Sequence, residues 1–155
     1  MSADGLEIAP ARADEDPGAS LLASFEAEIA ELYENWDRAV GPSASPAELS
    51  APHGAFLLVS LDGTGVGCGG VKRLSDGVAE IKRMFVDPEV RGRGVARRLL
   101  GALESAAREL GYTTVRLDSG RFQPDAHHLY STAGYRAIPD YNGNPYASFW
   151  FEKAL

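Results

Sequence analysis

One continuous stretch, residues 80–110 (EIKRMFVDPEVRGRGVARRLLGALESAAREL), constrains the fold more than any other part of the chain. It begins as a strand that ends in the apolar run Met84-Phe85-Val86. Asp87-Pro88 then stops the strand, because proline has no N–H to donate to a sheet. From about Gly94, apolar residues recur every three or four positions, which predicts a long amphipathic helix.

Between that strand and that helix lies a loop of alternating arginine and glycine, Arg91-Gly92-Arg93-Gly94. The start of a helix leaves backbone N–H groups without partners and carries a partial positive charge. Glycine lets a ligand oxygen come close to those groups, and arginine adds positive charge. We therefore predict an anion cradle suited to phosphate or pyrophosphate. The alternative is an ordinary turn whose arginines are only solvated.

Length and composition narrow the remaining choices. A chain of 155 residues is most simply one domain, so we expect residues 1–155 to form a single unit. Its one cysteine, Cys68, excludes an internal disulfide and a cysteine-based metal cluster, and we expect no metal. No signal peptide or membrane span is visible, which favours a cytoplasmic protein. The net charge of -7 argues against nucleic acid as a partner and favours cationic or amine substrates.

The rest of the chain alternates between strand-like and helix-like segments. Asp-Gly turns at Asp62-Gly63 and Asp76-Gly77 join three strand-like runs and predict an antiparallel meander. A strand after the long helix would pair in parallel with the last of these through a right-handed crossover. Strict alternation breaks at Lys82-Arg83, which indicates a β-bulge or a change of burial. The expected strands are residues 6–13, 55–61, 64–74, 78–86, 113–118, 135–138 and 146–153, and the expected helices are 21–36, 94–110 and 125–133.

Residues 65–70 read Gly-Val-Gly-Cys-Gly-Gly and match the dinucleotide-binding pattern G-x-G-x-x-G. That motif must follow a strand and open a helix. Here it continues into Val71-Lys72-Arg73-Leu74 and a hairpin turn, so we predict a strand and reject a Rossmann site. The glycines are expected to let a neighbouring backbone or a ligand approach closely. Cys68 is expected to be a small core residue rather than a reactive thiol.

Two motifs together resemble the GNAT superfamily of N-acetyltransferases. The first, Arg91-Gly92-Arg93-Gly94-Val95-Ala96, is similar to the acyl-CoA motif of that family. The second, Leu129-Tyr130-Ser131-Thr132-Ala133-Gly134-Tyr135, is similar to the family pattern of Leu-Tyr, three residues, glycine and an aromatic residue. The resemblance implies an α/β (α+β) fold with a mixed, mostly antiparallel central sheet. It also implies a β-bulge, a splayed parallel strand pair and helices on both faces.

The resemblance further implies how acetyl-CoA, the expected acyl donor, would bind. Its pantetheine arm would lie beside Phe85 and Val86 like an added strand. The family usually has asparagine seven residues before the motif tyrosine, and this chain has Gln123 there, which we take as a cofactor contact. The pyrophosphate would lie on the backbone N–H groups of Arg91, Gly92, Arg93, Gly94, Val95 and Ala96.

For the reaction, the resemblance implies direct attack of a primary amine on the thioester in a ternary complex. Tyr130 would be the general acid that protonates the leaving thiolate, and the alternative is a core aromatic. Glu80 is the candidate base, and the alternative is a solvent-facing strand residue. We expect a small-molecule amine as the acceptor. The alternatives are a protein or peptide amine, or a non-catalytic acyl-CoA-binding sensor or partner protein.

Several polar residues are expected at strand ends or in a late loop, where acceptor specificity usually resides. Turn chemistry explains residues 142–145 equally well. A homodimer through the C-terminal strands is expected from family habit and from the aromatic run at residues 149–151. The expected specificity residues are Asp118, Tyr141, Asn142, Asn144 and Tyr146.

Overall fold

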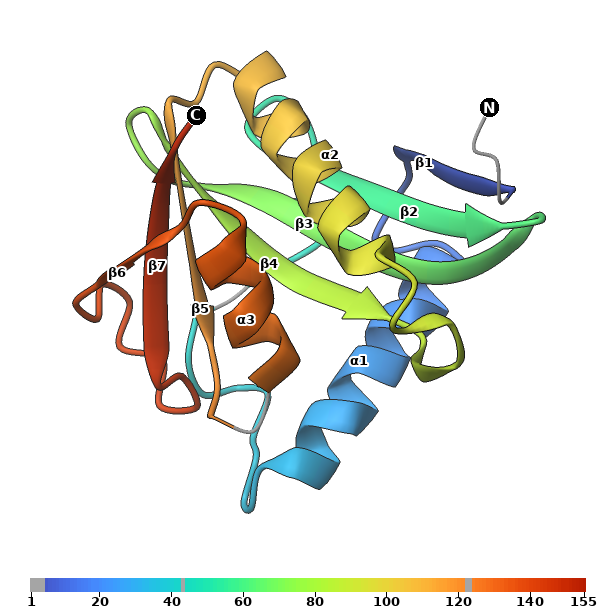
Figure 1. The fold of residues 1–155 in the computed structure, drawn as a ribbon, viewed down its shortest axis with the longest axis horizontal. Coiled ribbons are helices and arrows are strands. Elements are labelled where there is room, and N and C mark those ends of the chain that lie inside the picture. The colour runs from blue at the N-terminus through green and yellow to red at the C-terminus, as the bar shows by residue number, and fades with distance from the viewer. Residues whose placement is uncertain (1–4, 43, 122–123) are drawn as a thin grey trace.

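The computed structural model describes residues 5–42, 44–121 and 124–155. At its centre is a seven-stranded sheet in the order β1-β2-β3-β4-β5-β7-β6 (Figure 1). The strands are β1 Leu6–Pro10, β2 Ala55–Leu61, β3 Thr64–Ser75, β4 Val78–Val86, β5 Thr114–Ser119, β6 Arg136–Ile138 and β7 Phe149–Ala154. The helices are α1 Gly18–Leu32, α2 Val95–Glu109 and α3 Pro124–Thr132, with a short 3-10 turn, η1 Pro88–Val90. Neighbouring strands are antiparallel except for β4 and β5, which are parallel.

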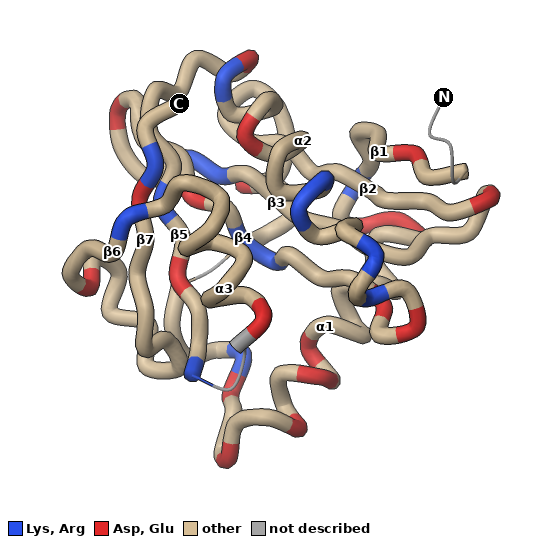
Figure 2. Tube along the Cα trace, in the orientation of Figure 1, with Lys and Arg blue, Asp and Glu red and all other residues tan. Residues whose placement is uncertain are grey.

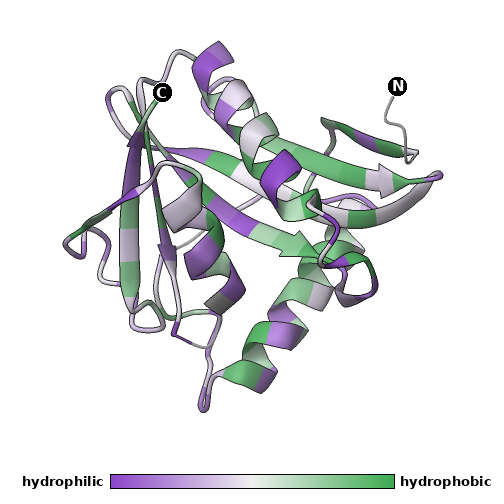
Figure 3. Cartoon of the chain, viewed as in Figure 1, coloured by the Kyte–Doolittle hydropathy of each residue, from purple (hydrophilic) through white to green (hydrophobic). Residues whose placement is uncertain are grey.

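Helices cover both faces of the sheet, because side chains along a strand alternate between its two faces. On β2, Leu57 and Val59 belong to a core shared with α2 and α3. Phe56 and Leu58 face a second core that contains Leu21 of α1. Figure 1 shows α2 and α3 crossing in front of the sheet, and Figure 3 shows apolar colour along the strands beneath them. The predicted mixed sheet with helices on both faces is confirmed.

The parallel strands β4 and β5 share only the first part of their length. Three residue pairs join them: Val78 with Thr114, Ala79 with Val115, and Glu80 with Arg116. Beyond these pairs β4 continues to Val86 and β5 to Ser119, and the two strands diverge in Figure 1. Backbone groups along this edge of β4 are therefore left for another partner. This is the splayed pair that the sequence predicted.

A β-bulge interrupts β4 beside the gap, at the predicted position. The register with β3 passes from Lys82 opposite Gly70 to Phe85 opposite Cys68, so β4 contains one residue more than β3 over this step. Arg83, inside the step, has a φ of 61°, which a residue with a side chain rarely adopts outside such irregularities. The bulge turns the second half of β4 away from β5.

The glycines of β3 are required because neighbours press on the strand from both faces. A Cβ atom on Gly69 would lie 2.7 Å from a methyl carbon of Leu103 in α2. A Cβ atom on Gly70 would lie 2.6 Å from a methyl carbon of Leu49. The glycine-rich segment is thus a strand under close contact, as predicted, and not a dinucleotide-binding turn.

Three elements differ clearly from the expected boundaries, and the first is β1, which ends at Pro10 rather than at residue 13. Helix α1 ends at Leu32 rather than at residue 36, because Tyr33 is extended with φ -116° and ψ 120°. The Tyr33 ring packs against Tyr146 at a centroid distance of 5.9 Å, and the Tyr146 hydroxyl accepts a hydrogen bond from the Asp37 amide at 2.8 Å. Contacts between distant segments here override the helical periodicity of the sequence. The last strand also begins later than expected, at Phe149.

Cys68 has no exposed surface, and burial raises the pKa of its thiol to about 12. We therefore expect the native protein to react with a water-soluble thiol reagent at least about 100-fold more slowly than the protein in denaturant, since the thiolate is the reactive form. Absorbance of the released chromophore, followed with and without guanidinium, measures both rates. Similar rates in the two conditions would contradict a structural role for this thiol.

Candidate active site

The loop between β4 and α2 has the open backbone that an anion cradle needs. Gly92 and Gly94 have φ values of 80° and 78°, which favour glycine, and nothing lies within 4 Å of a Cβ atom placed on either. Gly94 is the N-cap of α2. Among the described residues, the first hydrogen bond from the helix back to this loop joins the Arg98 N–H to the Gly94 carbonyl at 3.2 Å. The preceding amides are left for a ligand or water at the positive end of the helix dipole.

Basic residues lie along this loop and the start of α2, where the tube in Figure 2 is blue. Arg93 is exposed. Arg91 instead pairs with Glu28 of α1 at 2.6 Å, and its Nε donates to the Val86 carbonyl at 2.8 Å. Its guanidinium also lies 5.8 Å from the centre of the Phe85 ring. Arg91 thus braces the cradle against α1 and β4, and Glu28 offsets part of its charge.

Most of the other residues predicted to bind the cofactor have buried side chains, so mainly their backbone groups could contact a ligand. Phe85 and Val86 are both buried, and their side chains belong to the two separate cores. Val95 is buried and Ala96 partly buried, so their amides are the groups available to a ligand. Phe85 and Val86 lie on the part of β4 that continues beyond its pairs with β5, and the Val86 carbonyl already accepts from the Arg91 Nε. Gln123 lies outside the described residues.

A cavity of about 170 Å³ opens where β4 and β5 separate. Its walls come from the second half of β4, the end of β5, α1 with the loop after it, α3, and the loop before β7. Polar or aromatic side chains on these walls include Tyr33, Trp36, Lys82, Asp118, Ser119 and Tyr130. The cavity therefore places the predicted acid, Tyr130, next to a carboxylate and an ammonium group.

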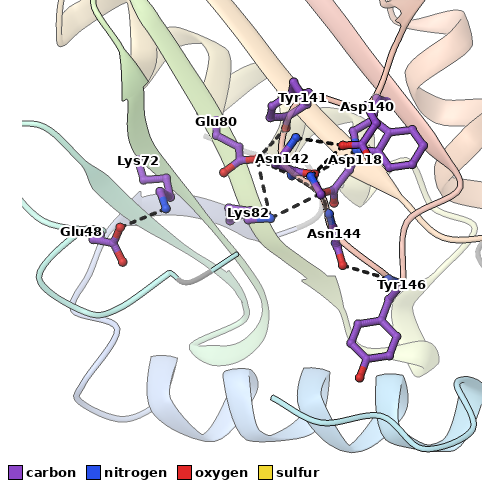
Figure 4. Close-up of polar contacts among 12 residues, drawn as sticks. Glu48, Lys72, Glu80, Lys82, Asp118, Asp140, Tyr141, Asn142, Asn144 and Tyr146 are labelled. Carbon is purple, nitrogen blue, oxygen red and sulfur yellow. Dashed lines mark hydrogen bonds and ion pairs between the residues drawn. The ribbon is translucent and has the colours of Figure 1, made fainter. Parts of the chain in front are cut away.

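Glu80, the candidate base, is adjacent to the cavity but does not line it. Its side chain is 1% exposed, so it is not a solvent-facing strand residue. The carboxylate accepts hydrogen bonds from the Tyr141 hydroxyl at 2.6 Å and from the Asn142 side-chain amide at 3.1 Å (Figure 4). Burial and the charge of Glu80 raise the pKa of Tyr141 far above its ordinary value, so Tyr141 remains a donor to this carboxylate.

Asp118 is the carboxylate that lines the cavity. It accepts hydrogen bonds from the side-chain amides of Asn142 at 2.6 Å and Asn144 at 3.1 Å. The Lys82 ammonium lies 3.6 Å from Asp118 and 3.7 Å from Glu80, between the two carboxylates (Figure 4). We call Glu80, Lys82 and Asp118 the ion cluster. With both carboxylates ionised and the lysine protonated, this cluster carries a net negative charge.

The loop before β7 is held against the ion cluster rather than lying free on the surface. The Asn142 side-chain oxygen accepts from the Trp150 indole N–H at 3.0 Å and from the Asn144 amide at 3.1 Å. The Asn144 side-chain oxygen accepts from the Tyr146 amide at 3.0 Å. The structure thus gathers the predicted specificity residues around two carboxylates, which turn chemistry alone does not explain.

Tyr130, on α3, lines the cavity beside Met84 and is 7% exposed. Its hydroxyl contacts the Met84 sulfur at 3.8 Å, and its ring packs against Tyr135 and Phe151 at 5.8 Å each. Burial, and then the charge of Asp118, raises the pKa of the Tyr130 phenol above its ordinary value. The phenol therefore keeps its proton at neutral pH and can donate it into the cavity.

Within the described residues, no three His, Cys, Asp or Glu side chains come together as a metal site. Nor does any helix in that part of the chain have the apolar length of a transmembrane segment.

Comparison with known proteins agrees with the geometry of the cradle and the gap. The family model for GNAT acetyltransferases matches residues 19–135. The chain belongs to the GNAT family. The matched range includes the cradle, both sequence motifs and the diverging strands, so the predicted family is confirmed.

Individual GNAT proteins are similar over most of this chain. An IAA acetyltransferase from Azospirillum brasilense is 36% identical over 117 residues, which cover 69% of this chain and 76% of that protein. The N-alpha-acetyltransferase RimI from Mycobacterium tuberculosis is 35% identical over 101 residues, which cover 63% of this chain and 61% of that protein. A GNAT family acetyltransferase from Elizabethkingia anophelis, solved with acetyl-CoA bound, superposes with a TM-score of 0.70 at 16% identity over 98% of this chain and 99% of that one. This structural similarity shows that the two chains share a fold.

Sequence reasoning missed several residues of this GNAT site. Lys82 had a usable signal, because it follows Glu80 by two positions on one strand and therefore lies on the same face. We used it only as a sign of the bulge. Tyr33 and Trp36 were assigned to a helix that ends before them, and nothing local to the sequence indicates that they line a cavity. No pattern in the sequence marks Ser119 as a residue that lines a cavity.

Proposed function

We propose that this GNAT protein is an acetyl-CoA-dependent N-acetyltransferase that acetylates the primary amine of a small molecule. One observation carries the proposal: the gap between β4 and β5 opens a cavity lined by the buried phenol of Tyr130 and the carboxylate of Asp118. The strand β4, which forms one side of this gap, leads directly into the cradle. A thioester in that gap would lie beside the Tyr130 phenol, the proposed acid, and beside the Asp118 carboxylate. Membership of the GNAT family supports acetyl-CoA as the donor.

The residues present fit coenzyme A. The pyrophosphate would accept hydrogen bonds from the amides of residues 92–96, where open space lies beside Gly92 and Gly94, while the Arg91 amide already donates to the Pro88 carbonyl at 3.3 Å. Arg93 would add positive charge from an exposed position. The pantetheine arm would lie along the free edge of β4 as far as the cavity. The thioester that it carries supplies the acetyl group.

The reaction would transfer one proton from the amine to the sulfur while an acetyl group moves the other way. The amine nitrogen, once deprotonated, attacks the carbonyl carbon, and the bond from that carbon to sulfur breaks. Tyr130 would protonate the departing thiolate. Asp118 is the carboxylate that an amine in the cavity would meet first. Glu80 would act as the base through the ion cluster or through a water molecule, since it does not line the cavity.

A peptide N-terminus is the second candidate acceptor, and its support is the similarity to RimI, which is named as an N-alpha-acetyltransferase. The cavity itself, about 170 Å³, favours a small molecule. The rest of a peptide would occupy a second, more open hollow of about 1010 Å³, which shares Tyr33, Trp36 and Tyr146 with the cavity. A non-catalytic acyl-CoA sensor would keep the cradle without needing Tyr130 or the ion cluster.

Thiol release from acetyl-CoA, measured with a panel of small amines and short peptides, tests this proposal. We expect at least one small amine to release coenzyme A well above the rate of hydrolysis, and the peptides to do so weakly or not at all. Binding of coenzyme A by calorimetry is the parallel measurement. Cofactor binding without thiol release from any acceptor would show a sensor. Release with peptides alone would move the acceptor class to polypeptides.

A further inference from the structure

We propose that the acceptor is a zwitterion, an amino acid or a close relative that carries a carboxylate near its primary amine. This inference rests on the proposed N-acetyltransferase function and names its acceptor more closely. Its evidence is the set of polar groups on the cavity wall, where one carboxylate stands beside several hydrogen-bond donors. Two of those donors are buried without the partners that they need.

The charges on the cavity wall do not suit a simple cationic amine. Three basic side chains line the cavity, Arg38, Lys82 and Arg83, with one carboxylate, Asp118. This balance is opposite to that of the whole chain, whose net charge is -7. Outside the lining, Glu26 lies 3.7 Å from Arg38 and Glu80 lies 3.7 Å from Lys82. Asp118 can hold an ammonium group, but a ligand that carries only positive charge has no acceptor for the N–H donors of the three basic side chains. A ligand with both charges satisfies both sets of groups.

The first donor without a close hydrogen-bond acceptor is the ammonium group of Lys82. Its side chain is 10% exposed, and its ammonium carries three N–H donors. The two carboxylates of the ion cluster lie 3.7 and 3.6 Å away, which is too far for good hydrogen bonds. Within the described part of the chain, the Lys82 side chain makes these two ion pairs and no hydrogen bond, while its backbone pairs with Gly70 of β3. The two carboxylates offset the charge of Lys82, but its N–H donors still lack a close acceptor, which a ligand oxygen in the cavity would supply.

The second donor without a hydrogen-bond acceptor is the hydroxyl of Ser119, which is an observation independent of Lys82. Ser119 is 5% exposed, and its hydroxyl is buried with no hydrogen-bond partner among the described residues. Ser119 follows Asp118 directly at the end of β5 and lines the same cavity. Buried polar atoms without partners are rare and costly, so their presence in a cavity indicates a ligand or water. A carboxylate oxygen would accept from this hydroxyl.

The remaining walls are apolar or aromatic and suit the rest of such a molecule. Tyr33 and Trp36 follow α1, Phe25 and Ile29 come from α1 itself, and Tyr146 comes from the loop before β7. A volume of about 170 Å³ is several times that of a water molecule, about 30 Å³, and suits a small organic molecule. The cavity thus offers a place for an ammonium, a carboxylate and an apolar side chain together.

The test uses wild-type protein and matched acceptors. Thiol release is measured for each common α-amino acid, its carboxamide and its decarboxylated amine. We expect the best amino acid to exceed its carboxamide and its amine by about 10- to 100-fold in kcat/KM, the range for one charge-assisted hydrogen bond. The carboxamide also stands for a peptide N-terminus. Equal or higher activity with the carboxamide or the amine would overturn the zwitterion while leaving the acetyltransferase intact. If no compound leads to thiol release from acetyl-CoA, both the zwitterionic acceptor and the acetyltransferase function are contradicted.

Ser119→Ala provides a readout that a merely structural role would not give. Removing an unpartnered hydroxyl should leave the melting temperature unchanged or higher, since nothing in the fold pairs with it. We expect it to raise KM for the amino acid by about 3- to 30-fold, with KM for acetyl-CoA unchanged. An unchanged KM for the amino acid would overturn the contact from Ser119.

Lys82→Met tests the ammonium. In the folded variant, confirmed by circular dichroism and by unchanged coenzyme A affinity, the preference for an amino acid over its carboxamide should fall to less than about threefold. Lys82→Arg keeps the charge and should retain part of the preference. A preference that survives in Lys82→Met would overturn the role of this residue. If Lys82→Met does not fold, the zwitterion proposal is decided by the rates of wild-type protein with an amino acid, its carboxamide and its amine.

Discussion

Replacing Gly94 by glutamate is expected to lower the affinity for coenzyme A by about 100-fold or more, while leaving the fold largely intact. The new carboxylate would lie at the start of α2, where the diphosphate is proposed to bind, and would repel it and compete for the same amides. Losing two charge-assisted hydrogen bonds accounts for a change of that size. Isothermal titration with coenzyme A measures the affinity, and thermal unfolding measures the fold.

Two matched variants separate the charge from other effects of this substitution. Gly94→Ala carries the same backbone penalty at a φ of 78°, about 1–2 kcal/mol, but adds no charge. Gly101→Glu places a carboxylate on the same helix, at an exposed position where a Cβ atom meets nothing within 4 Å. We expect coenzyme A to bind both controls nearly as well as wild type. If Gly94→Glu also keeps its affinity, the cradle does not hold the diphosphate.

Tyr130→Phe is expected to lower kcat by about 10- to 1000-fold, with little change in the affinity for coenzyme A, because a general acid acts only in the chemical step. Stability should change little, since the contact of this hydroxyl within the described residues is the Met84 sulfur at 3.8 Å. The raised pKa of Tyr130 also means that its phenol stays protonated up to at least about pH 10, its ordinary value. Loss of this proton therefore causes no fall in kcat below that pH.

Tyr135→Phe is the control for this prediction. Its ring packs against that of Tyr130 at 5.8 Å, but its hydroxyl donates to the buried Glu104 at 2.7 Å and does not line the cavity. We expect this variant to lose about 1–2 kcal/mol of stability and to keep its kcat. Denaturant unfolding and steady-state kinetics give the two values. An unchanged kcat in Tyr130→Phe would leave that tyrosine as a packing residue.

Much of the fold could be predicted because its signals are local. The turn at Asp87-Pro88, the glycines before α2 and the Asp-Gly turns each depend on the conformational limits of a few adjacent residues. The bulge at Arg83 left a trace in the alternation of β4. The boundary of α1 was wrong because Tyr33 leaves the helix for a partner 113 positions away, Tyr146, and no local pattern records such a contact.

By itself, the sequence determined the family, the order of most elements and the place of the anion cradle. Each of these depends on residues close together along the chain, where backbone geometry and hydrophobic periodicity act directly. Only the tertiary structure decided which carboxylate lines the cavity. Glu80 and Asp118 lie on different strands that pair and then part, so the divergence of β4 from β5 places Asp118 on the cavity wall and leaves Glu80 enclosed by Tyr141, Asn142 and Lys82. That divergence depends on a helix packing across the sheet and on a bulge, and its geometry is a property of the assembled core.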